Sequence, residues 1–191
     1  MIPLHHSVEF QHHLWDDILP SSKYIVDITC GNGHDTEYLL SRSHEESQLY
    51  TIDIQDIAIH RTRERLEETC PTQLHRVHFL TGSHDVQLAG LPIPHIDLMV
   101  ANLGYLPNAN HQTMTSADTT IQALTIGLEK LSVQGLCTIV AYPGTDEGRE
   151  EQYAVQQFLE SLDQRYYHCS TWHPINQANH PPILYIIRRR K

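Results

Sequence analysis

The chain has 191 residues, of which 40% are hydrophobic and 7% aromatic, and its formal net charge is -10 with histidines neutral. This length suits one domain with a sizeable core, and no run of about 18 apolar residues is present to form a transmembrane helix. The acidic balance argues against broad, nonspecific nucleic-acid binding, which depends on neutralising phosphates. It leaves room for a local basic surface, such as residues 188–191 or Arg61, Arg63 and Arg65.

The distribution of cysteines and histidines bears on compartment and metal binding. Cys30, Cys70, Cys137 and Cys169 form no CxxC pair, which favours reduced thiols in a cytoplasmic protein. The N-terminus lacks the basic and apolar regions of a secretory signal. The fifteen histidines form no HxxxH or HExxH spacing with a partner carboxylate, so no metal site is predicted.

Apolar runs alternate with helical patterns along the chain, which predicts an α/β domain with a mostly parallel sheet and helices on both faces. Helices are predicted at residues 5–19, 35–43, 56–68, 119–131 and 147–162. Strands are predicted at residues 24–29, 48–53, 76–80, 96–101 and 136–142. Two further strands, 166–172 and 183–188, follow without an intervening helix. This ending suits the seven-stranded, Rossmann-like sheet of class I methyltransferases, whose last strand is antiparallel.

A glycine-rich turn lies within residues 27–36, between the first strand and the helix that follows it. Gly31 and Gly33 permit positive φ and close approach of a ligand, and the next helix offers free N–H groups to an anionic group. Thr36 stands where a GxGxxG dinucleotide motif has its third glycine. The turn is therefore predicted to bind a small zwitterionic ligand rather than a pyrophosphate. For Asp35, capping of the helix is the alternative role.

Polar residues follow the next two strands as well. Asp53 ends the second strand, 20 residues beyond Gly33, where a carboxylate faces the ribose hydroxyls of a nucleoside bound across the strand ends. Gln55 can assist it. Ser83 and His84 follow the third strand, where an adenine edge would lie. Glycine turn, acid and polar loop occur in the order expected of an S-adenosylmethionine site.

The stretch Ala-Asn-Leu-Gly-Tyr-Leu-Pro, residues 101–107, follows the fourth strand. The Asn102 side-chain oxygen and the Leu103 carbonyl can accept the hydrogens of an amine, and the Tyr105 ring can cover it. We predict catalytic roles for these three residues, exerted mostly by positioning. The sequence shows no evident His–carboxylate pair, which leaves His84 as an alternative proton acceptor. The predicted cofactor-binding residues are Asp27, Gly31, Asn32, Gly33, Asp35, Thr36, Asp53, Gln55, Ser83, His84, Asn102 and Gly104.

These motifs resemble the small class I methyltransferases known as YtqB or MnmM proteins, once labelled rRNA methylases. The resemblance runs from about Asp27 to Ile186 and is carried by residues 31–36, 53–55, 83–84, 102–107, 142–144 and 175–182. It implies one S-adenosylmethionine-dependent domain over residues 1–191. The implied reaction methylates the aminomethyl group of a tRNA wobble uridine, usually 5-aminomethyl-2-thiouridine, with the anticodon stem-loop as partner.

On the substrate side, the resemblance implies that Tyr142, Asn176 and Asn179 join Tyr105 in stacking on and hydrogen-bonding an exposed base. Ordinary turn structure around the neighbouring prolines is the alternative for these residues. The chain departs from the family pattern in two places. Residues 108–111 read Asn-Ala-Asn-His instead of Gly-Gly-Asp-Lys, and Thr145 replaces a histidine.

Other functions remain open on the sequence alone. One alternative is an N-methyltransferase acting on another RNA, a protein amide or a small amine. A second is a non-catalytic scaffold with the same fold, although a scaffold needs neither the glycine turn nor Asp53. A nicotinamide dehydrogenase is disfavoured by the missing third glycine. The sequence leaves a homodimer as an open alternative to a monomer.

Overall fold

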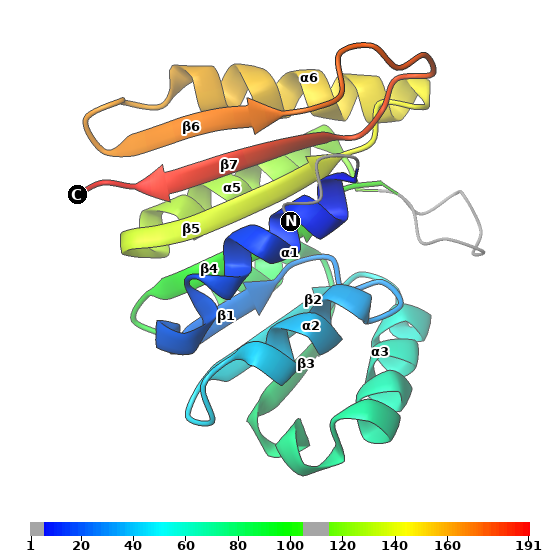
Figure 1. The fold of residues 1–191 in the computed structure, drawn as a ribbon, viewed down its shortest axis with the longest axis vertical. Coiled ribbons are helices and arrows are strands. Elements are labelled where there is room, and N and C mark those ends of the chain that lie inside the picture. Colours follow the sequence, from blue (N-terminus) through cyan, green and yellow to red (C-terminus); the bar gives the residue numbers. More distant parts are fainter. Residues whose placement is uncertain (1–5, 105–114) are drawn as a thin grey trace.

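The computed structural model describes residues 6–104 and 115–191. Seven strands form one sheet in the order β3-β2-β1-β4-β5-β7-β6 (Figure 1). Their bounds are β1 Tyr24–Asp27, β2 Gln48–Asp53, β3 Val77–Thr81, β4 Ile96–Asn102, β5 Leu131–Ala141, β6 Tyr167–Trp172 and β7 Ile183–Arg189. Strands β1 to β5 pair in parallel, whereas β7 is antiparallel to both β5 and β6. The expected sheet, with its antiparallel last strand, is confirmed.

Helices cover both faces of the sheet (Figure 1). Their bounds are α1 Ser7–Asp16, α2 His34–Arg42, α3 Asp56–Thr69, α4 His84–Ala89, α5 Ala117–Lys130 and α6 Asp146–Ser161. One hydrophobic core joins the sheet to α4, α5 and α6, and a second joins it to α1, α2 and α3. Successive side chains of a strand point to opposite faces of the sheet. In β4, Leu98 therefore packs in the core beside α1, α2 and α3, and Met99 packs in the core beside α4, α5 and α6.

Several element boundaries differ from those expected. The helix predicted at residues 5–19 ends at Asp16. Pro20 lies in a separate 3-10 turn, Leu19–Ser21. Pro20 is in the first part of this turn, where a backbone N–H would have no partner within the turn, so its missing N–H costs nothing. A 3-10 segment Pro71–Arg76 and helix α4 were not predicted, because such short elements give too little periodicity. Strand β5 begins at Leu131, which was assigned to the preceding helix. Gly135 lies within this strand, near a register irregularity.

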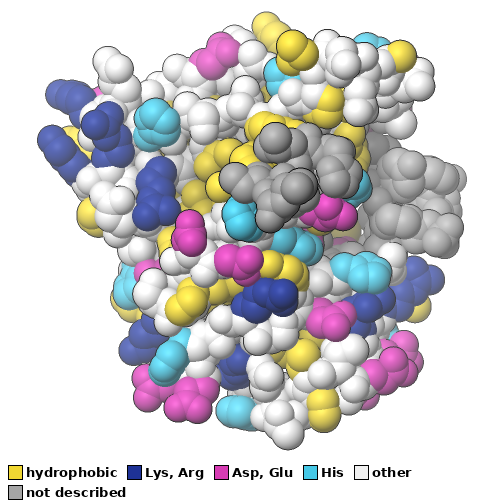
Figure 2. All heavy atoms as spheres, viewed as in Figure 1, with side chains coloured by type: hydrophobic (Ala, Val, Ile, Leu, Met, Phe, Trp, Pro, Cys, Tyr) yellow, Lys and Arg dark blue, Asp and Glu magenta, His cyan; other side chains and the backbone are white. Residues whose placement is uncertain are grey.

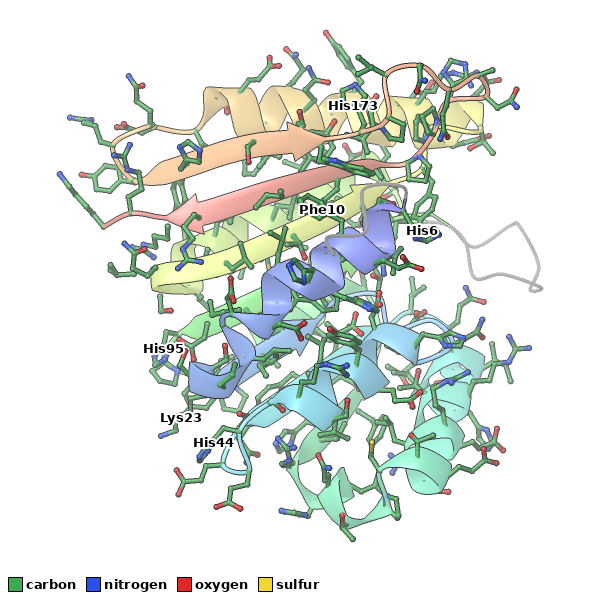
Figure 3. All side chains as sticks on the ribbon, viewed as in Figure 1. His6, Phe10, Lys23, His44, His95 and His173 are labelled. Atoms are coloured by element: carbon green, nitrogen blue, oxygen red, sulfur yellow. The ribbon has the colours of Figure 1, made fainter. Side chains whose placement is uncertain are left out.

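Helix α1 is fastened to the sheet by one buried polar contact. Trp15 is fully buried, and its indole N–H donates to Thr138 Oγ1 of β5 at 2.9 Å. Its ring also contacts the His12 ring, with centroids 4.8 Å apart. At the other end of α1, Phe10 packs against Trp172 at the end of β6, with ring centroids 5.3 Å apart. Figure 3 labels Phe10 on α1, His6 at the N-cap of this helix and His173 just beyond β6. The helix therefore spans from the sheet centre to the β6–β7 hairpin.

None of the helices within the described ranges combines the length and apolar character needed to cross a lipid bilayer.

The Trp15 contact is testable by substitution. Trp15→Phe removes the indole donor and leaves the buried Thr138 hydroxyl without it. We expect the free energy of unfolding to fall by about 1–3 kcal/mol, in addition to the loss from the smaller ring. Adding Thr138→Val removes the stranded hydroxyl, so the double variant should lose less than the sum of the single variants in urea denaturation. Strict additivity would show that the contact contributes nothing.

Candidate active site

A cavity of about 710 Å³ opens at the carboxyl ends of the parallel strands, a size usual for small-molecule sites. The strand order switches sides between β1 and β4, since β2 and β3 extend the sheet on one side of β1 and β4 and β5 on the other, and ligands of open α/β sheets bind at such a switch point. The lining comes from the turn after β1, the ends of β2, β4 and β5, and the starts of α1, α4 and α5. Most of the site residues predicted from the sequence line this cavity. They are Gly31, Asn32, Asp35, Asp53, Gln55, Ser83, His84, Asn102, Leu103, Gly104 and Tyr142.

The glycine turn is shaped by two residues in the left-handed region, Gly31 at φ 55° and Gly33 at φ 81°. A Cβ on Gly33 would lie 2.9 Å from Thr62 Cα, so α3 packs here directly against backbone. The Gly31 N–H donates to Asp53 Oδ2 at 3.0 Å, which joins the turn to β2. The turn thus holds its backbone N–H groups and the Asp53 carboxylate beside one another.

The Asp53 carboxylate has capacity left for a ligand. Its second oxygen accepts the Gln55 N–H at 3.0 Å, so each oxygen has one protein donor and can accept another hydrogen. Burial raises the pKa of Asp53, an effect that these backbone donors oppose. Two adjacent ribose hydroxyls match this pair of oxygens.

His84 supplies a further unsatisfied group at the cavity wall. Its Nε2 atom is buried and has no hydrogen-bond partner among the described residues. Burial lowers the pKa of His84, which favours the neutral imidazole. The Nε2 atom has no exposed surface in the ligand-free protein, so contact of this nitrogen with adenine stays a prediction. The residue itself lines the cavity near Asp53 and the glycine turn, where the nucleoside part of S-adenosylmethionine is expected.

Asp27, Gly33 and Thr36 lie outside the cavity lining. Asp27 is 2% exposed and accepts the Thr29 N–H at 3.1 Å and the Thr36 hydroxyl at 2.7 Å. Burial, and then the charge of Asp35, raise the pKa of Asp27 to about 7. These residues hold the glycine turn from beneath, and direct cofactor contact by them stays a prediction.

The amide of Asn102 is oriented from both ends. Gln11 Nε2 donates to Asn102 Oδ1 at 3.1 Å, and Asn102 Nδ2 donates to Asp35 Oδ2. Asp35 Oδ1 in turn contacts His12 Nε2 at 2.5 Å. The structure therefore contains a His–carboxylate pair that the sequence did not reveal. Gln11 and His12 lie on α1, far along the chain from Asn102, and no motif marked them.

The alternative capping role of Asp35 is wrong. Gly33 is the N-cap of α2, and Asp35 lies inside the first turn with its side chain bonded to His12 and Asn102. The carboxylate is thus directed to long-range partners rather than to its own helix.

Two hydrogen bonds join Gly104 and Thr115. The Gly104 N–H donates to Thr115 Oγ1 at 2.9 Å, and the Thr115 N–H donates to the Gly104 carbonyl at 3.1 Å. The buried Glu151 carboxylate of α6 accepts the hydroxyls of Thr115 at 2.7 Å and Thr120 at 2.6 Å. Tyr105 and residues 108–111 lie outside the described residues.

The predicted substrate-side residues separate into two groups. Tyr142 lines the cavity, and burial and the charge of Asp35 raise its pKa to about 12, which keeps its hydroxyl a donor. Asn176 and Asn179 are exposed and do not line the cavity. His180, which no motif marks as a site residue, reaches the lining instead. Thr145 also lines it and caps α6, accepting the Gly148 N–H at 3.0 Å.

The two basic groups lie in different places. Arg188 pairs with Leu136 and Ile183 with Ala141, so the end of β7 lies about 17 Å along the sheet from the carboxyl end of β5. Figure 2 shows lysine and arginine side chains gathered there. Arg189 Nη1 donates to the carbonyls of Glu129 and Leu131. Residues 188–191 therefore lie away from the cavity, and contact of this basic group with tRNA phosphates stays a prediction.

The second basic group adjoins the cavity mouth. Arg61 Nη1 donates to Asn32 Oδ1 at 3.2 Å, and Arg65 Nε donates to the Asn32 carbonyl at 2.8 Å. Arg65 also pairs with Glu37 at 3.1 Å. Within the described ranges, no cluster of three or more His, Cys, Asp or Glu side chains is arranged to hold a metal ion.

Known proteins are similar to this chain over most of its length. The family model described as "Putative rRNA methylase" matches residues 49–188, beginning after the glycine turn. The tRNA (mnm(5)s(2)U34)-methyltransferase, chloroplastic, of Arabidopsis thaliana is 29% identical over 195 residues, covering 96% of this chain and 69% of that protein.

Two solved structures extend the similarity over the glycine turn. A protein from Clostridium thermocellum described as an rRNA-methylase is 36% identical with a TM-score of 0.90, covering 96% of this chain and 97% of its own. A methyltransferase from Streptococcus mutans in complex with SAH is 31% identical with a TM-score of 0.85, covering 96% and 98%.

Asp53 provides the first test of the cofactor site. Asp53→Ala removes charged hydrogen bonds to the ribose and should weaken S-adenosylmethionine binding by about 1.5–3 kcal/mol. Calorimetry measures this directly, with Asp56→Ala as control because Asp56 is exposed and outside the cavity lining. Equal affinities in the wild type and the Asp53 variant would remove the ribose assignment.

Asp27 predicts a pH dependence of stability in the ligand-free protein. Its pKa is raised from 3.8 to about 7, so the folded protein keeps a proton that the unfolded chain releases between these values. The contribution of Asp27 to stability is present at low pH and lost as pH rises to about 7. Asp27→Asn abolishes this titration. In urea denaturation the variant should therefore gain stability relative to wild type between about pH 5 and about pH 8, and a constant difference would contradict the raised pKa.

Proposed function

This chain belongs to the rRNA-methylase family and is an S-adenosylmethionine-dependent methyltransferase with the class I fold, and from that premise we propose its substrate. The proposed acceptor is the 5-aminomethyl group of a tRNA wobble uridine, in particular 5-aminomethyl-2-thiouridine. The product is the 5-methylaminomethyl nucleoside. We assign this activity to residues 1–191 as one catalytic domain.

Two kinds of observation support the proposal. The Arabidopsis relative, 29% identical over nearly the whole chain, is named for a tRNA wobble position. The observation that carries it in this structure is the polar group at the end of β4, where Asn102 and Asp35 adjoin at the cavity wall. An amine with two or three hydrogens needs acceptors, and this group presents amide and carboxylate oxygens together.

The proposed reaction requires mainly that the acceptor nitrogen is positioned against the methyl group. S-adenosylmethionine supplies, when bound, a methyl group made electrophilic by a cationic sulfonium. The acceptor nitrogen must be neutral, since a protonated amine has no lone pair. Asn102 Oδ1, already bonded to Gln11, keeps one lone pair for an amine hydrogen. With the Leu103 carbonyl it would aim the nitrogen lone pair at the methyl group.

The tRNA would reach this site past polar and aromatic side chains. Tyr142 and His180 at the lining, and the Phe10–Trp172 ring pair beside the hairpin, offer stacking and edge contacts to unstacked bases. Arg61 and Arg65, beside Asn32, are the candidate phosphate contacts at the cavity mouth, and residues 188–191 are candidates farther along the sheet. We place the anticodon stem-loop across this mouth.

Nucleoside mass spectrometry distinguishes the proposal from the other nitrogen acceptors. Purified protein, S-adenosylmethionine and tRNA bearing 5-aminomethyl-2-thiouridine should yield the methylaminomethyl nucleoside at the wobble position. Undermodified tRNA without the aminomethyl group is the matched control and should gain no methyl group. Methylation of a ring nitrogen in either tRNA, or of protein alone, would contradict the proposed acceptor.

Asn102→Ala tests the positioning role in the same assay. Removing the amide takes away an acceptor for the amine and the donor to Asp35, so turnover should fall by about 10²-fold, as expected for a misplaced reacting group. Binding of SAH, measured by calorimetry, should be nearly retained and reports that the variant is folded. Near-normal turnover would show that Asn102 only shapes the turn after β4 and does not position the amine.

A further inference from the structure

We propose that Asp35 is the carboxylate that receives the positive charge and the proton of the attacking amine, and that His12 positions it. This inference rests on the proposed function, because it requires an amine as acceptor. The sequence predicts that Asp35 binds the cofactor, whereas this proposal assigns it to the acceptor amine. It also supplies the proton acceptor that the sequence did not identify.

The placement of Asp35 supports this role. The residue is 8% exposed and nevertheless lines the cavity, beside the Asn102 amide that is proposed to hold the amine. Its Oδ1 contacts His12 and its Oδ2 accepts from Asn102. Each oxygen therefore has one protein donor and room for one more hydrogen. A carboxylate left so nearly buried is best satisfied by a cation at the cavity.

The supporting contacts come from α1, which packs beside α2 in the same hydrophobic core. His12 stacks on Tyr38 of α2, with ring centroids 3.9 Å apart, and Trp15 one turn along α1 contacts the same imidazole. Tyr38 is held in turn by its hydroxyl, which donates to Asp16 at 2.8 Å. The imidazole thus packs against two aromatic rings, which also contact each other, while its Nε2 lies 2.5 Å from Asp35.

The charged and titratable groups around the pair are few. Asp27 lies beneath Asp35, and the charge of Asp35 contributes to its raised pKa. Tyr142 faces it from the end of β5 with a hydroxyl that stays protonated. Arg42 lies over the Tyr38 ring and pairs with Asp16 at 3.3 Å. Among the described groups, Asp35 is the acid that both lines the cavity and adjoins Asn102.

The amine loses its proton after the methyl group has been transferred. The neutral amine attacks with its lone pair, an N–C bond forms, and the C–S bond breaks with its electron pair left on sulfur. The nitrogen becomes a secondary ammonium, whose charge the carboxylate stabilises as it develops. One N–H bond then breaks, the proton moves to Asp35, and the nitrogen keeps the electron pair. Asp35 changes from charged to neutral and later releases the proton to solvent.

Asp35→Asn tests the carboxylate with little change of shape. The assay is single-turnover methylation of aminomethyl tRNA, at a pH above that at which the wild-type rate levels off, so that the free amine is not limiting. We expect the rate to fall by about 10²–10³-fold, the loss typical when one charge-stabilising group is removed. The affinity for SAH should be unchanged. Asp118→Asn, an exposed acid in the first turn of α5, is the matched control.

Two results would overturn the role of Asp35. An unchanged rate in the variant would show that the carboxylate does not assist the reaction. A loss of SAH affinity as large as the loss of rate, in a variant with normal thermal unfolding, would assign Asp35 to the cofactor. Wild-type protein that forms no product on aminomethyl tRNA would instead refute the proposed function itself, so the two failures are distinguishable.

His12 variants test the same contact without altering Asp35. His12→Ala removes the partner at Oδ1 and should lower the single-turnover rate by about tenfold or more, the effect of a lost hydrogen bond to a charged group. In His12→Gln a side-chain N–H can replace Nε2, and most of the rate should return. His13→Ala changes the exposed neighbour and should have no effect. Equal rates in the alanine and glutamine variants, or a normal rate in both, would refute positioning by His12.

Discussion

The parallel pairing of β1 with both β2 and β4 is the constraint on which the other features depend. Parallel strands bring their carboxyl ends to one edge, and a crevice opens there because the strand order switches sides between β1 and β4. Gly31, Asp53 and Asn102 follow three different strands and meet at that crevice for this reason alone. The helices on the two faces then need only cover the sheet, which leaves the edge free for polar groups.

Three acids gather around this edge, and each is satisfied by a different kind of donor. Backbone N–H groups hold Asp53, a threonine hydroxyl and an N–H hold Asp27, and His12 and Asn102 hold Asp35. Their mutual repulsion adds to the cost of burial, as the raised pKa of Asp27 shows. A cationic sulfonium cofactor and an amine that gains positive charge both relieve this repulsion. The accumulation of negative charge is therefore consistent with the proposed chemistry.

The sequence predicted most of what lies directly after a strand. The bounds of β2 agree with those expected, and the polar residues after β1, β2 and β4 line the cavity as their position in a parallel sheet requires. The sequence could not predict the contacts that tertiary packing makes between residues far apart in the chain. Gln11 and His12 reach Asn102 and Asp35 only because Trp15 fixes α1 on β5. Likewise, His180 rather than Asn176 or Asn179 enters the lining, and an irregular connection such as the one between β6 and β7 has no periodicity from which its conformation could be predicted.

A crystal structure with SAH and an anticodon stem-loop carrying 5-aminomethyluridine would test the central claim most directly. The account predicts that the amine nitrogen lies within about 3.2 Å of an Asp35 oxygen and of Asn102 Oδ1, on the side of the cavity facing the sulfur. It also predicts that the ribose of SAH bonds to Asp53. An amine placed away from Asp35, with the amino group of SAH bonded to that carboxylate instead, would contradict the account.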